Sequence, residues 1–416
     1  MKENIKKILK QELMKIKPNY EEVKTIDEKT KKIIDVIEKN IKKKKVKAQV
    51  FVGGSSAKDT LIKKKKYDID LFVRFDSKYD EKKISDMLQK LIPKGSVKQK
   101  GSRDYFSIKK DNIDFEMIPV MKIKNPKQAK NITDLSYFHV NYVKKQINKH
   151  KGLSDEIRLA KAFTYYQECY GAESYINGFS GYAIELLIIY YKSFIRFLKA
   201  MTKIKDRLII DMEQMYKNKN QLIQEMNKSK LSSPIILIDP TNKERNALAA
   251  LSEDTFKEFQ KKANQFLKNP SVRFFIIEDK KQALEKKYKD KLKKIQLKTK
   301  KQAGDIGGTK LKKFYNYFIR ELEEYFIVDK SDFEYDEDKN IGTIYLVVKP
   351  KKEIIFNGPP VKMKKALKNF RKQHKKIKIK NNRAYAVEKI NIDLAKFLKM
   401  FKKDKRKVIL EMGVSL

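Results

Sequence analysis

The first 44 residues carry apolar side chains at helical spacing. One stretch places four of them on a single helical face: Ile5, Leu9, Leu13 and Ile16. Pro18 ends this stretch, because proline interrupts a helix and restricts the residue before it. A second stretch with the same spacing runs through Ile33 and Ile37 into the basic residues 42–45. The pattern predicts two amphipathic helices at the N-terminus.

The spacing then changes to strict alternation, which is typical of strands. Apolar residues occupy every second position of 46–52 and of 67–75, and a Gly-Gly-Ser-Ser turn lies between them at 53–56. A hairpin follows, with strands over 104–109 and 113–118. We therefore expect residues 1–147 to form a small α+β domain.

Helical spacing returns over 155–170 and 181–200. A short extended segment, rich in β-branched residues and bounded by prolines, lies at 234–240. Residues 148–268 are thus predicted to form a second, mainly helical domain.

The remaining residues, 269–416, alternate between helix and strand patterns. The expected elements are a helix at 311–326, a strand at 343–348, a break at 358–360, a helix at 361–374, a strand at 385–387 and a helix at 393–401. This order predicts a third part of the chain with an α+β fold.

Composition narrows the class of protein. The 416 residues carry a formal net charge of +45, which favours a polyanionic partner such as nucleic acid, although a lysine-rich proteome would also raise this charge. The single cysteine excludes an internal disulfide, and the three histidines do not have zinc-ligand spacing. No apolar run is long enough to span a bilayer and the N-terminus lacks a signal-type core, so we expect a cytoplasmic protein that does not bind a membrane.

Two acids share one face of the strand predicted at 67–75. Asp68 and Asp70 are two residues apart, so their side chains project from the side opposite the apolar face. Paired carboxylates of this kind can hold Mg²⁺, and two such ions roughly 3.5–4 Å apart serve phosphoryl-transfer chemistry in many polymerases. A third carboxylate is expected on a neighbouring strand, where Glu116 is the candidate and Asp114 the less favoured alternative. Solvated acids on a sheet face are the plainer interpretation of Asp68 and Asp70 taken by themselves.

The turn before that strand has the residues of a phosphate-binding loop. Gly53 and Gly54 allow backbone amides to approach phosphate oxygens closely, and Ser55 adds a hydroxyl donor. Lys58 follows about one turn later and is expected to contact a triphosphate. A Gly-Gly-Ser turn and an Asp-x-Asp strand are each weak signals, but their occurrence in this order favours a nucleotidyltransferase.

These motifs resemble those of the polymerase-β-like nucleotidyltransferase superfamily, and a longer series resembles the archaeal, class I CCA-adding enzymes. The matching blocks occur in family order at 52–60, 68–73, 177–182, 239–240, 245–252 and 357–361. Because they span nearly the whole chain, the series is far more specific than any one block.

The resemblance implies a multidomain α+β protein with a polymerase-β-like head at 1–147, a helical neck at 148–268 and an α+β body and tail at 269–416. It further implies template-independent addition of C, C and A to the 3′ end of tRNA from CTP and ATP, with Mg²⁺ as cofactor. The body and tail would hold the acceptor and T-arm of the tRNA, and a homodimer is a common state of such relatives.

The resemblance also assigns residues. Asp68, Asp70 and Glu116 resemble the metal-binding acids, and Gly53, Gly54, Ser55 and Lys58 resemble the triphosphate loop. Further nucleotide contacts are implied for His139, Lys161, Tyr170 and Arg245, of which Arg245 would read the base edge. Each has a plainer interpretation as a packing or surface residue. Two positions depart from the family pattern: Glu116 replaces an aspartate, and Leu135 replaces an arginine.

Two alternatives remain at this stage. A poly(A)-polymerase-like enzyme of the same superfamily would add A residues without using CTP. A catalytically inactive relative would bind tRNA tightly through its charge, in a salt-dependent manner, without incorporating nucleotides.

Overall fold

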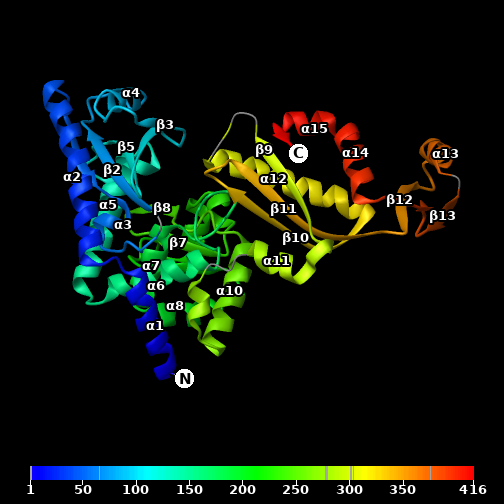
Figure 1. Cartoon of the computed structure of the whole chain (residues 1–416), viewed down its shortest axis with the longest axis horizontal. Coiled ribbons are helices and arrows are strands. Elements are labelled where there is room, and N and C mark those ends of the chain that lie inside the picture. Colours follow the sequence, from blue (N-terminus) through cyan, green and yellow to red (C-terminus); the bar gives the residue numbers. More distant parts are fainter. Residues whose placement is uncertain (1, 65, 277–279, 300–301, 303, 375) are drawn as a thin grey trace. The chain divides into compact units, whose positions relative to one another are not determined.

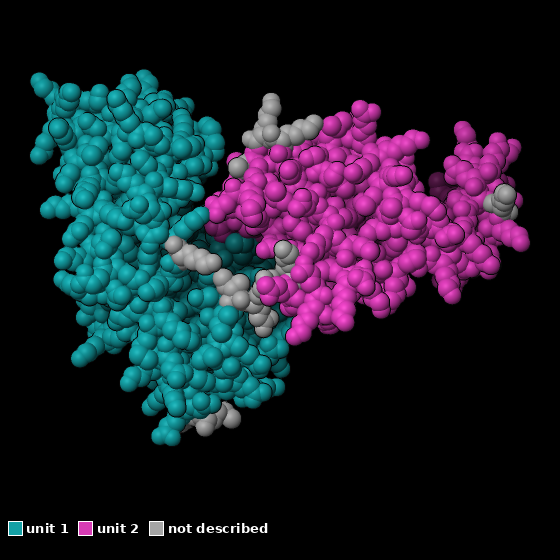
Figure 2. Space-filling view, in the orientation of Figure 1, with its two compact units in different colours: residues 1–172, 176–277 teal, residues 173–175, 278–416 magenta. Residues whose placement is uncertain are grey.

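The computed structural model describes residues 2–64, 66–276, 280–299, 302, 304–374 and 376–416. They form two compact units, which are described separately (Figure 2). Unit 1 comprises residues 1–172 and 176–277, and unit 2 comprises residues 173–175 and 278–416. Unit 1 therefore includes the segments expected to be head and neck, and it continues past 268 because Phe274 and Phe275 pack into its core.

The two predicted N-terminal helices are confirmed. Helix α1 spans Lys2–Ile16 and helix α2 spans Tyr20–Lys43. Asn19 begins α2 with a reciprocal cap: its side chain accepts a hydrogen bond from the Glu22 amide at 2.8 Å, and the Glu22 carboxylate accepts one from the Asn19 amide at 2.9 Å. The apolar face of α2 packs through the fully buried Ile37 against the first sheet.

A five-stranded sheet forms the centre of the N-terminal part of unit 1 (Figure 1). Its strands are β1 (Ala48–Val52), β2 (Tyr67–Phe75), β3 (Val97–Gln99), β4 (Tyr105–Lys110) and β5 (Ile113–Met121). Their order is β1-β2-β5-β4-β3, in which β2 and β5 are parallel and all other neighbours antiparallel. The predicted hairpin is confirmed as β4 and β5, with Asp111 in the left-handed conformation at its turn.

Helices cover one face of this sheet and leave the acids on the other. Helix α2 and the short α4 (Ile84–Gln89) bury the apolar residues of β2 and β5, including Ile69 and Phe115. Because side chains alternate along a strand, Asp68 and Asp70 project from the opposite face. The four-residue helix α3 (Gly54–Ala57) connects β1 to β2 at this face.

The rest of unit 1 is mainly helical. Its helices are α5 (Ser136–Lys149), α6 (Leu153–Tyr166), α7 (Gly181–Tyr191), α8 (Phe194–Met201), α9 (Lys219–Glu225) and α10 (Glu253–Lys268). A small sheet joins β6 (Leu208–Ile210), β7 (Ile235–Asp239) and β8 (Asn242–Asn246), which confirms the extended segment predicted at 234–240. Phenylalanines dominate the core, where Phe163 contacts the rings of Phe194, Phe259 and Phe266.

The single helix predicted at 181–200 is wrong, since α7 and α8 are separate. Lys192 adopts a left-handed conformation with φ of 61°, which ends α7. Ser193 then begins α8 by accepting a hydrogen bond from the Arg196 amide. Neither glycine nor proline marks this break, so the continuous apolar pattern concealed it.

Unit 2 contains two further sheets. Strands β9 (Lys293–Thr299), β10 (Phe326–Asp336), β11 (Ile341–Pro350) and β15 (Val414–Ser415) form one sheet in the order β10-β11-β9-β15. Unit 2 also contains the helices α11 (Lys280–Tyr288), α12 (Gly304–Tyr325), α14 (Leu394–Asp404) and α15 (Arg406–Glu411). Helix α12 buries Phe314 and Phe318 against this sheet and against Phe401 of α14.

The second sheet of unit 2 joins β12 (Glu353–Pro360), β13 (Ile377–Lys380) and β14 (Arg383–Lys389) in the order β12-β14-β13. Helix α13 (Lys364–Gln373) packs on it through Leu367 and Phe370. The break predicted at 358–360 is wrong, because these residues continue β12 through an irregularity between Asn357 and Pro360.

Candidate active site

The Gly-Gly-Ser turn lies against the acidic face of β2. The Gly53 amide donates to the Asp70 carbonyl at 2.8 Å, which fixes the start of α3 beside that strand. Gly54 has a φ of 56°, a conformation that favours glycine, and a Cβ at this position would overlap Asp70 Oδ2. Glycine is therefore required here both by the backbone conformation and by the close approach of the carboxylate.

Asp68 and Asp70 share the predicted face but differ in environment. The Asp68 side chain is 64% exposed, whereas that of Asp70 lies deeper beside Gly54. Burial raises the pKa of Asp70 to about 6, with a further contribution from the negative charge of Asp68 and opposition from the positive charge of Lys58. A desolvated carboxylate next to a second carboxylate is an electrostatic environment that a cation stabilises.

The parallel pairing of β2 and β5 places both candidates for the third acid in register with this pair. Glu116 is the partner of Asp70, and Asp114 is the partner of Asp68. Burial raises the pKa of Asp114, and its buried Oδ1 has no hydrogen-bond partner among the described residues. Neither acid lines the cavity described below, so the choice between them stays a prediction.

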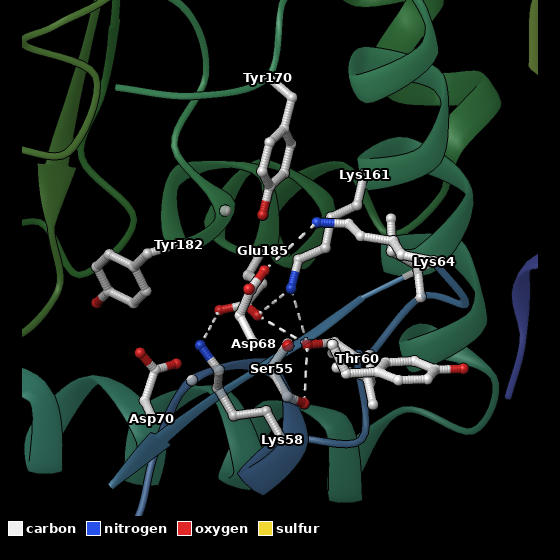
Figure 3. Close-up of a pocket in the computed structure, with 15 residues that line it drawn as sticks. Ser55, Lys58, Thr60, Lys64, Asp68, Asp70, Lys161, Tyr170, Tyr182 and Glu185 are labelled. Carbon is white, nitrogen blue, oxygen red and sulfur yellow. Dashed lines mark hydrogen bonds and ion pairs between the residues drawn. The ribbon is translucent and has the colours of Figure 1, made fainter. Parts of the chain in front are cut away.

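A buried ion network joins the turn to helices α6 and α7 (Figure 3). Glu185 of α7 is fully buried, and its two oxygens lie 2.6 Å from Lys58 Nζ and 2.7 Å from Lys161 Nζ. The Thr60 hydroxyl donates to Glu185 at 2.9 Å and accepts a hydrogen bond from Lys161 at 2.9 Å. The carboxylate thus holds two lysines of distant sequence position side by side.

The charges of this network are strongly shifted. Burial would raise the pKa of Glu185, but the attraction of Lys161 and Lys58 outweighs it and lowers that pKa to about 2. Burial lowers the pKa of Lys161 to about 8, with help from the like charges of Lys58 and Lys64, while Glu185 acts in the opposite direction. Glu185 is therefore ionised at neutral pH, whereas Lys161 has its charge change just above neutrality.

These groups line a cavity of about 290 Å³. Of the predicted site residues, the structure brings seven together in its wall: Gly54, Ser55, Lys58, Asp68, Asp70, Lys161 and Tyr170. Residues Gly181 and Tyr182, at the N-terminus of the eleven-residue α7, also line it. Ser180 caps this helix by accepting a hydrogen bond from the Ala183 amide at 3.1 Å. Lysines together with a helix N-terminus are suited to a polyanion such as a triphosphate.

His139 and Arg245 do not line this cavity but converge on the buried Asp239. Asp239 Oδ2 lies 2.9 Å from His139 Nε2 and 2.7 Å from an Arg245 guanidinium nitrogen. The Tyr182 hydroxyl donates to Asp239 Oδ1 at 3.0 Å, and the His139 ring stacks on Tyr182 with centroids 4.1 Å apart. Since Tyr182 also lines the cavity, the Asp239 cluster lies next to it.

Burial sets the charge states of this cluster. It lowers the pKa of His139, which is therefore neutral at pH 7, although Asp239 opposes the shift. It also raises the pKa of Tyr182 well above its usual value, so the hydroxyl stays a donor. Arg245 is thus the permanent cation that offsets Asp239, and Asp239 fixes the direction of its guanidinium.

Three important residues of this site were given no role from the sequence: Glu185, Thr60 and Asp239, of which the last two lie in the matching blocks 52–60 and 239–240. Glu185 interrupts an apolar run, and a charged residue in a buried helix needs partners; this was the available signal. Its lysine partners are 24 and 127 residues away, so their identity depends on the fold.

The acids fit a magnesium site built from few protein ligands. Mg²⁺ is commonly held by one or two carboxylates together with substrate phosphates. Asp68 and Asp70 supply two carboxylates beside lysines suited to the phosphates, and Gly54 leaves space for the Asp70 carboxylate. In the described part of the chain, no three His, Cys, Asp or Glu side chains are already grouped to hold an ion.

No helix of the described residues is long and apolar enough to cross a bilayer.

Comparisons with known proteins match two parts of the chain to domain families and the chain to several relatives. Residues 155–276 match the family "tRNA nucleotidyltransferase, second domain", and residues 3–137 match the "Second Messenger Oligonucleotide or Dinucleotide Synthetase domain". Among solved structures, a Cid1 RNA terminal uridylyl transferase aligns with a TM-score of 0.50 and 13% identity over 65% of this chain and 97% of that chain. This last likeness shows the polymerase-β-like fold.

Two archaeal relatives are more similar in sequence. The CCA-adding enzyme of Nanoarchaeum equitans is 42% identical over 249 residues, which are 58% of this chain and 62% of that protein. The CCA-adding enzyme of Methanocaldococcus jannaschii is 31% identical over 399 residues, which are 92% of this chain and 87% of that protein. The chain therefore belongs to the CCA-adding enzyme family of tRNA nucleotidyltransferases.

Proposed function

We propose that this chain extends the 3′ end of tRNA by C, C and A, using CTP and ATP and releasing pyrophosphate. Family membership supports the reaction. The observation that carries the proposal is a single cavity lined by the Gly54–Ser55 turn, Asp68, Asp70 and two lysines joined through Glu185. A cytoplasmic location is proposed with it, because the substrate is tRNA.

The lysines and the acids of the cavity have different proposed roles toward the nucleotide. Lys58 and Lys161 bind the triphosphate, together with the Ser55 hydroxyl and the N-terminus of α7. The terminal tRNA hydroxyl attacks the α-phosphorus, a new P–O bond forms, and the bond to the β-phosphate breaks to release pyrophosphate. Asp68 and Asp70 would hold Mg²⁺, which neutralises phosphate charge and favours ionisation of the hydroxyl when bound. Glu116 remains the proposed third carboxylate.

Arg245 is proposed to recognise the base. Asp239 fixes its guanidinium at 2.7 Å, and the guanidinium carbon lies 5.4 Å from the ring centroid of Tyr182, which lines the cavity. The two acceptors N3 and O2 of cytosine, and the ring nitrogens of adenine, can accept such donors. His139, as a neutral ring, and Tyr170 contribute contacts to the sugar or phosphates.

Unit 2 is proposed to bind the acceptor and T-arm of the tRNA. The formal net charge of +45 supports a polyanionic partner of this kind. We expect tRNA affinity to fall steeply with salt concentration, because lysine–phosphate contacts release counterions.

One assay tests the proposed function. A tRNA transcript that lacks CCA, and one that ends in CC, are each incubated with the protein, Mg²⁺ and each nucleoside triphosphate singly, and the 3′ ends are sequenced. Addition of two C residues from CTP, and of one A only to ends that already carry CC, is the expected result. Long A-only tails would show a poly(A) polymerase instead, and salt-sensitive tRNA binding without incorporation would show an inactive relative.

The pH profile of nucleotide use should report Lys161. The protonated lysine binds phosphate, and its charged fraction falls as pH rises through its pKa of about 8. We therefore expect kcat/KM for CTP to decline above about pH 8 and to be independent of this group below it. Replacing Lys161 with arginine, which stays charged, should move the decline to higher pH. An unchanged profile in that variant would assign the decline to another group.

Gly54→Ala should impair catalysis more than stability. The new Cβ would displace the Asp70 carboxylate, and a misplacement of about 1 Å can cost about 10²-fold in rate. Gly95→Ala is the matched control, since Gly95 also has a positive φ, of 86°, but a Cβ there meets no atom within 4 Å. Both variants should lose the stability that a positive φ costs alanine, and Gly54→Ala somewhat more because of the displaced carboxylate, while only Gly54→Ala loses about 10²-fold in CTP incorporation. Equal activities would show that the close approach to Asp70 is unimportant.

A further inference from the structure

Lys64 is a cavity residue that the proposed mechanism does not yet use. It belongs to the basic run before β2 and lines the same cavity as Lys58 and Lys161. Its Nζ lies 5.0 Å from the ring centroid of Tyr165 and 5.6 Å from that of Tyr170. These cation–π contacts hold the ammonium in place. The Lys64 side chain is 26% exposed, so a ligand in the cavity can reach it.

The neighbouring lysine, Lys63, does not line the cavity. Lys63 Nζ pairs with Glu22 of α2 at 2.6 Å, and its side chain is 46% exposed. Its backbone amide donates to the Ile16 carbonyl at 2.6 Å, so this part of the run is tied to the N-terminal helices. Lys63 and Lys64 therefore have the same chemistry but only Lys64 faces the cavity.

Lys64 differs from the other two cavity lysines in how its charge is balanced. Lys58 and Lys161 both bond to Glu185, at 2.6 and 2.7 Å. Lys64 Nζ lies 4.0 Å from Asp68 Oδ2, which is too long for a hydrogen bond. No hydrogen bond joins this ammonium to another of the described residues, so its donors can bind a ligand.

The positive charge of Lys64 matters for the binding of a triphosphate. Three lysines line the cavity, and Glu185 offsets one of their charges, which leaves 3 − 1 = 2 positive charges. Without Lys64 the same count leaves 2 − 1 = 1, with Asp68 and Asp70 set aside as the expected ligands of Mg²⁺. Lys64 thus supplies half of the uncompensated positive charge that these lysines offer to phosphate.

We propose that Lys64 is a third phosphate-binding lysine of the nucleotide site, held in place by Tyr165 and Tyr170. It contacts the triphosphate of the incoming nucleotide and the pyrophosphate that leaves. This inference rests on the proposed function, because it names a further contact of the same substrate.

The test compares Lys64→Met with the matched control Lys63→Met in the full-length protein. Incorporation of CTP into a tRNA lacking CCA is measured at saturating tRNA and Mg²⁺. For Lys64→Met we expect KM for CTP and the inhibition constant of pyrophosphate both to rise about tenfold, as for loss of a charge-assisted contact. Lys63→Met should stay within about twofold of the unaltered protein, and Lys64→Arg should recover most of the affinity because it restores the charge.

The pyrophosphate constant separates binding from a structural role, since pyrophosphate shares only the phosphate contacts of the nucleotide. If Lys64→Met does not fold, as judged by circular dichroism, Lys64→Gln takes its place. Unchanged constants, equal effects of Lys63→Met and Lys64→Met, or a rise in KM for tRNA instead of CTP would each overturn the proposal. If the unaltered protein incorporates neither CTP nor ATP, it is the proposed function that fails, which is a distinguishable outcome.

Discussion

Asp70→Asn is expected to lower kcat for CTP incorporation by about 10³-fold or more. A divalent metal held at this position would stabilise transition-state charge by several kcal/mol, and each 1.36 kcal/mol corresponds to about tenfold in rate. The amide keeps the size of the carboxylate but loses the negative charge that would bind the ion. Single-turnover incorporation at saturating CTP and tRNA measures this loss.

The same variant should remain folded, which makes the loss of activity interpretable. Burial already raises the pKa of Asp70 to about 6, so the protein without metal gains little from its charge. We expect the melting temperature without Mg²⁺ to be unchanged or slightly higher in Asp70→Asn. Asp111→Asn provides the control, because Asp111 is an exposed acid at the β4–β5 turn whose side chain is 73% accessible. Activity of Asp70→Asn within tenfold of the control would contradict the assignment of Asp70.

The third carboxylate can be identified by the same assay. Glu116 is in register with Asp70 and Asp114 with Asp68, so the backbone alone does not choose between them. Glu116→Gln and Asp114→Asn remove one charge each with little change of shape. The proposed role of Glu116 requires the first variant to lose far more activity than the second.

The paired acids were predictable because their signal is local. Period-two alternation places Asp68 and Asp70 on one face, and the covering of the other face by α2 confirms it. The Gly-Gly-Ser turn was equally readable, because glycine is needed at the left-handed position of Gly54. In both cases a few neighbouring residues determine the geometry.

The parts that sequence did not reveal depend on long-range contacts or on weak local signals. The sequence predicted Glu116 on a neighbouring strand, but not the parallel register of β2 and β5 that puts it beside Asp70, which joins residues 46 positions apart. The break between α7 and α8 occurs at Lys192 without glycine or proline. Phe326 continues the apolar spacing of α12, yet it begins β10, where it pairs with Pro350 at the far end of the following strand β11.

Glu185→Gln is expected to destabilise the protein by about 3–5 kcal/mol, the usual cost of removing one partner from a buried ion pair. The glutamine keeps the shape and one acceptor, but Lys58 and Lys161 would then be buried side by side without a negative charge. Urea unfolding at pH 7 measures this difference. Glu156→Gln is the control, because Glu156 is a partly buried acid of α6 that accepts a hydrogen bond from the Phe194 amide, and burial raises its pKa.

A double-substitution cycle attributes the effect to the ion network. Adding Lys58→Met to Glu185→Gln removes one of the two uncompensated charges, so the double variant should be more stable than Glu185→Gln by itself. A triphosphate supplies negative charge at the same place. CTP should therefore raise the melting temperature of Glu185→Gln by more than that of the unaltered protein. An equal rise in both proteins would mean that Glu185 stabilises the fold without offsetting the lysines that are proposed to bind phosphate.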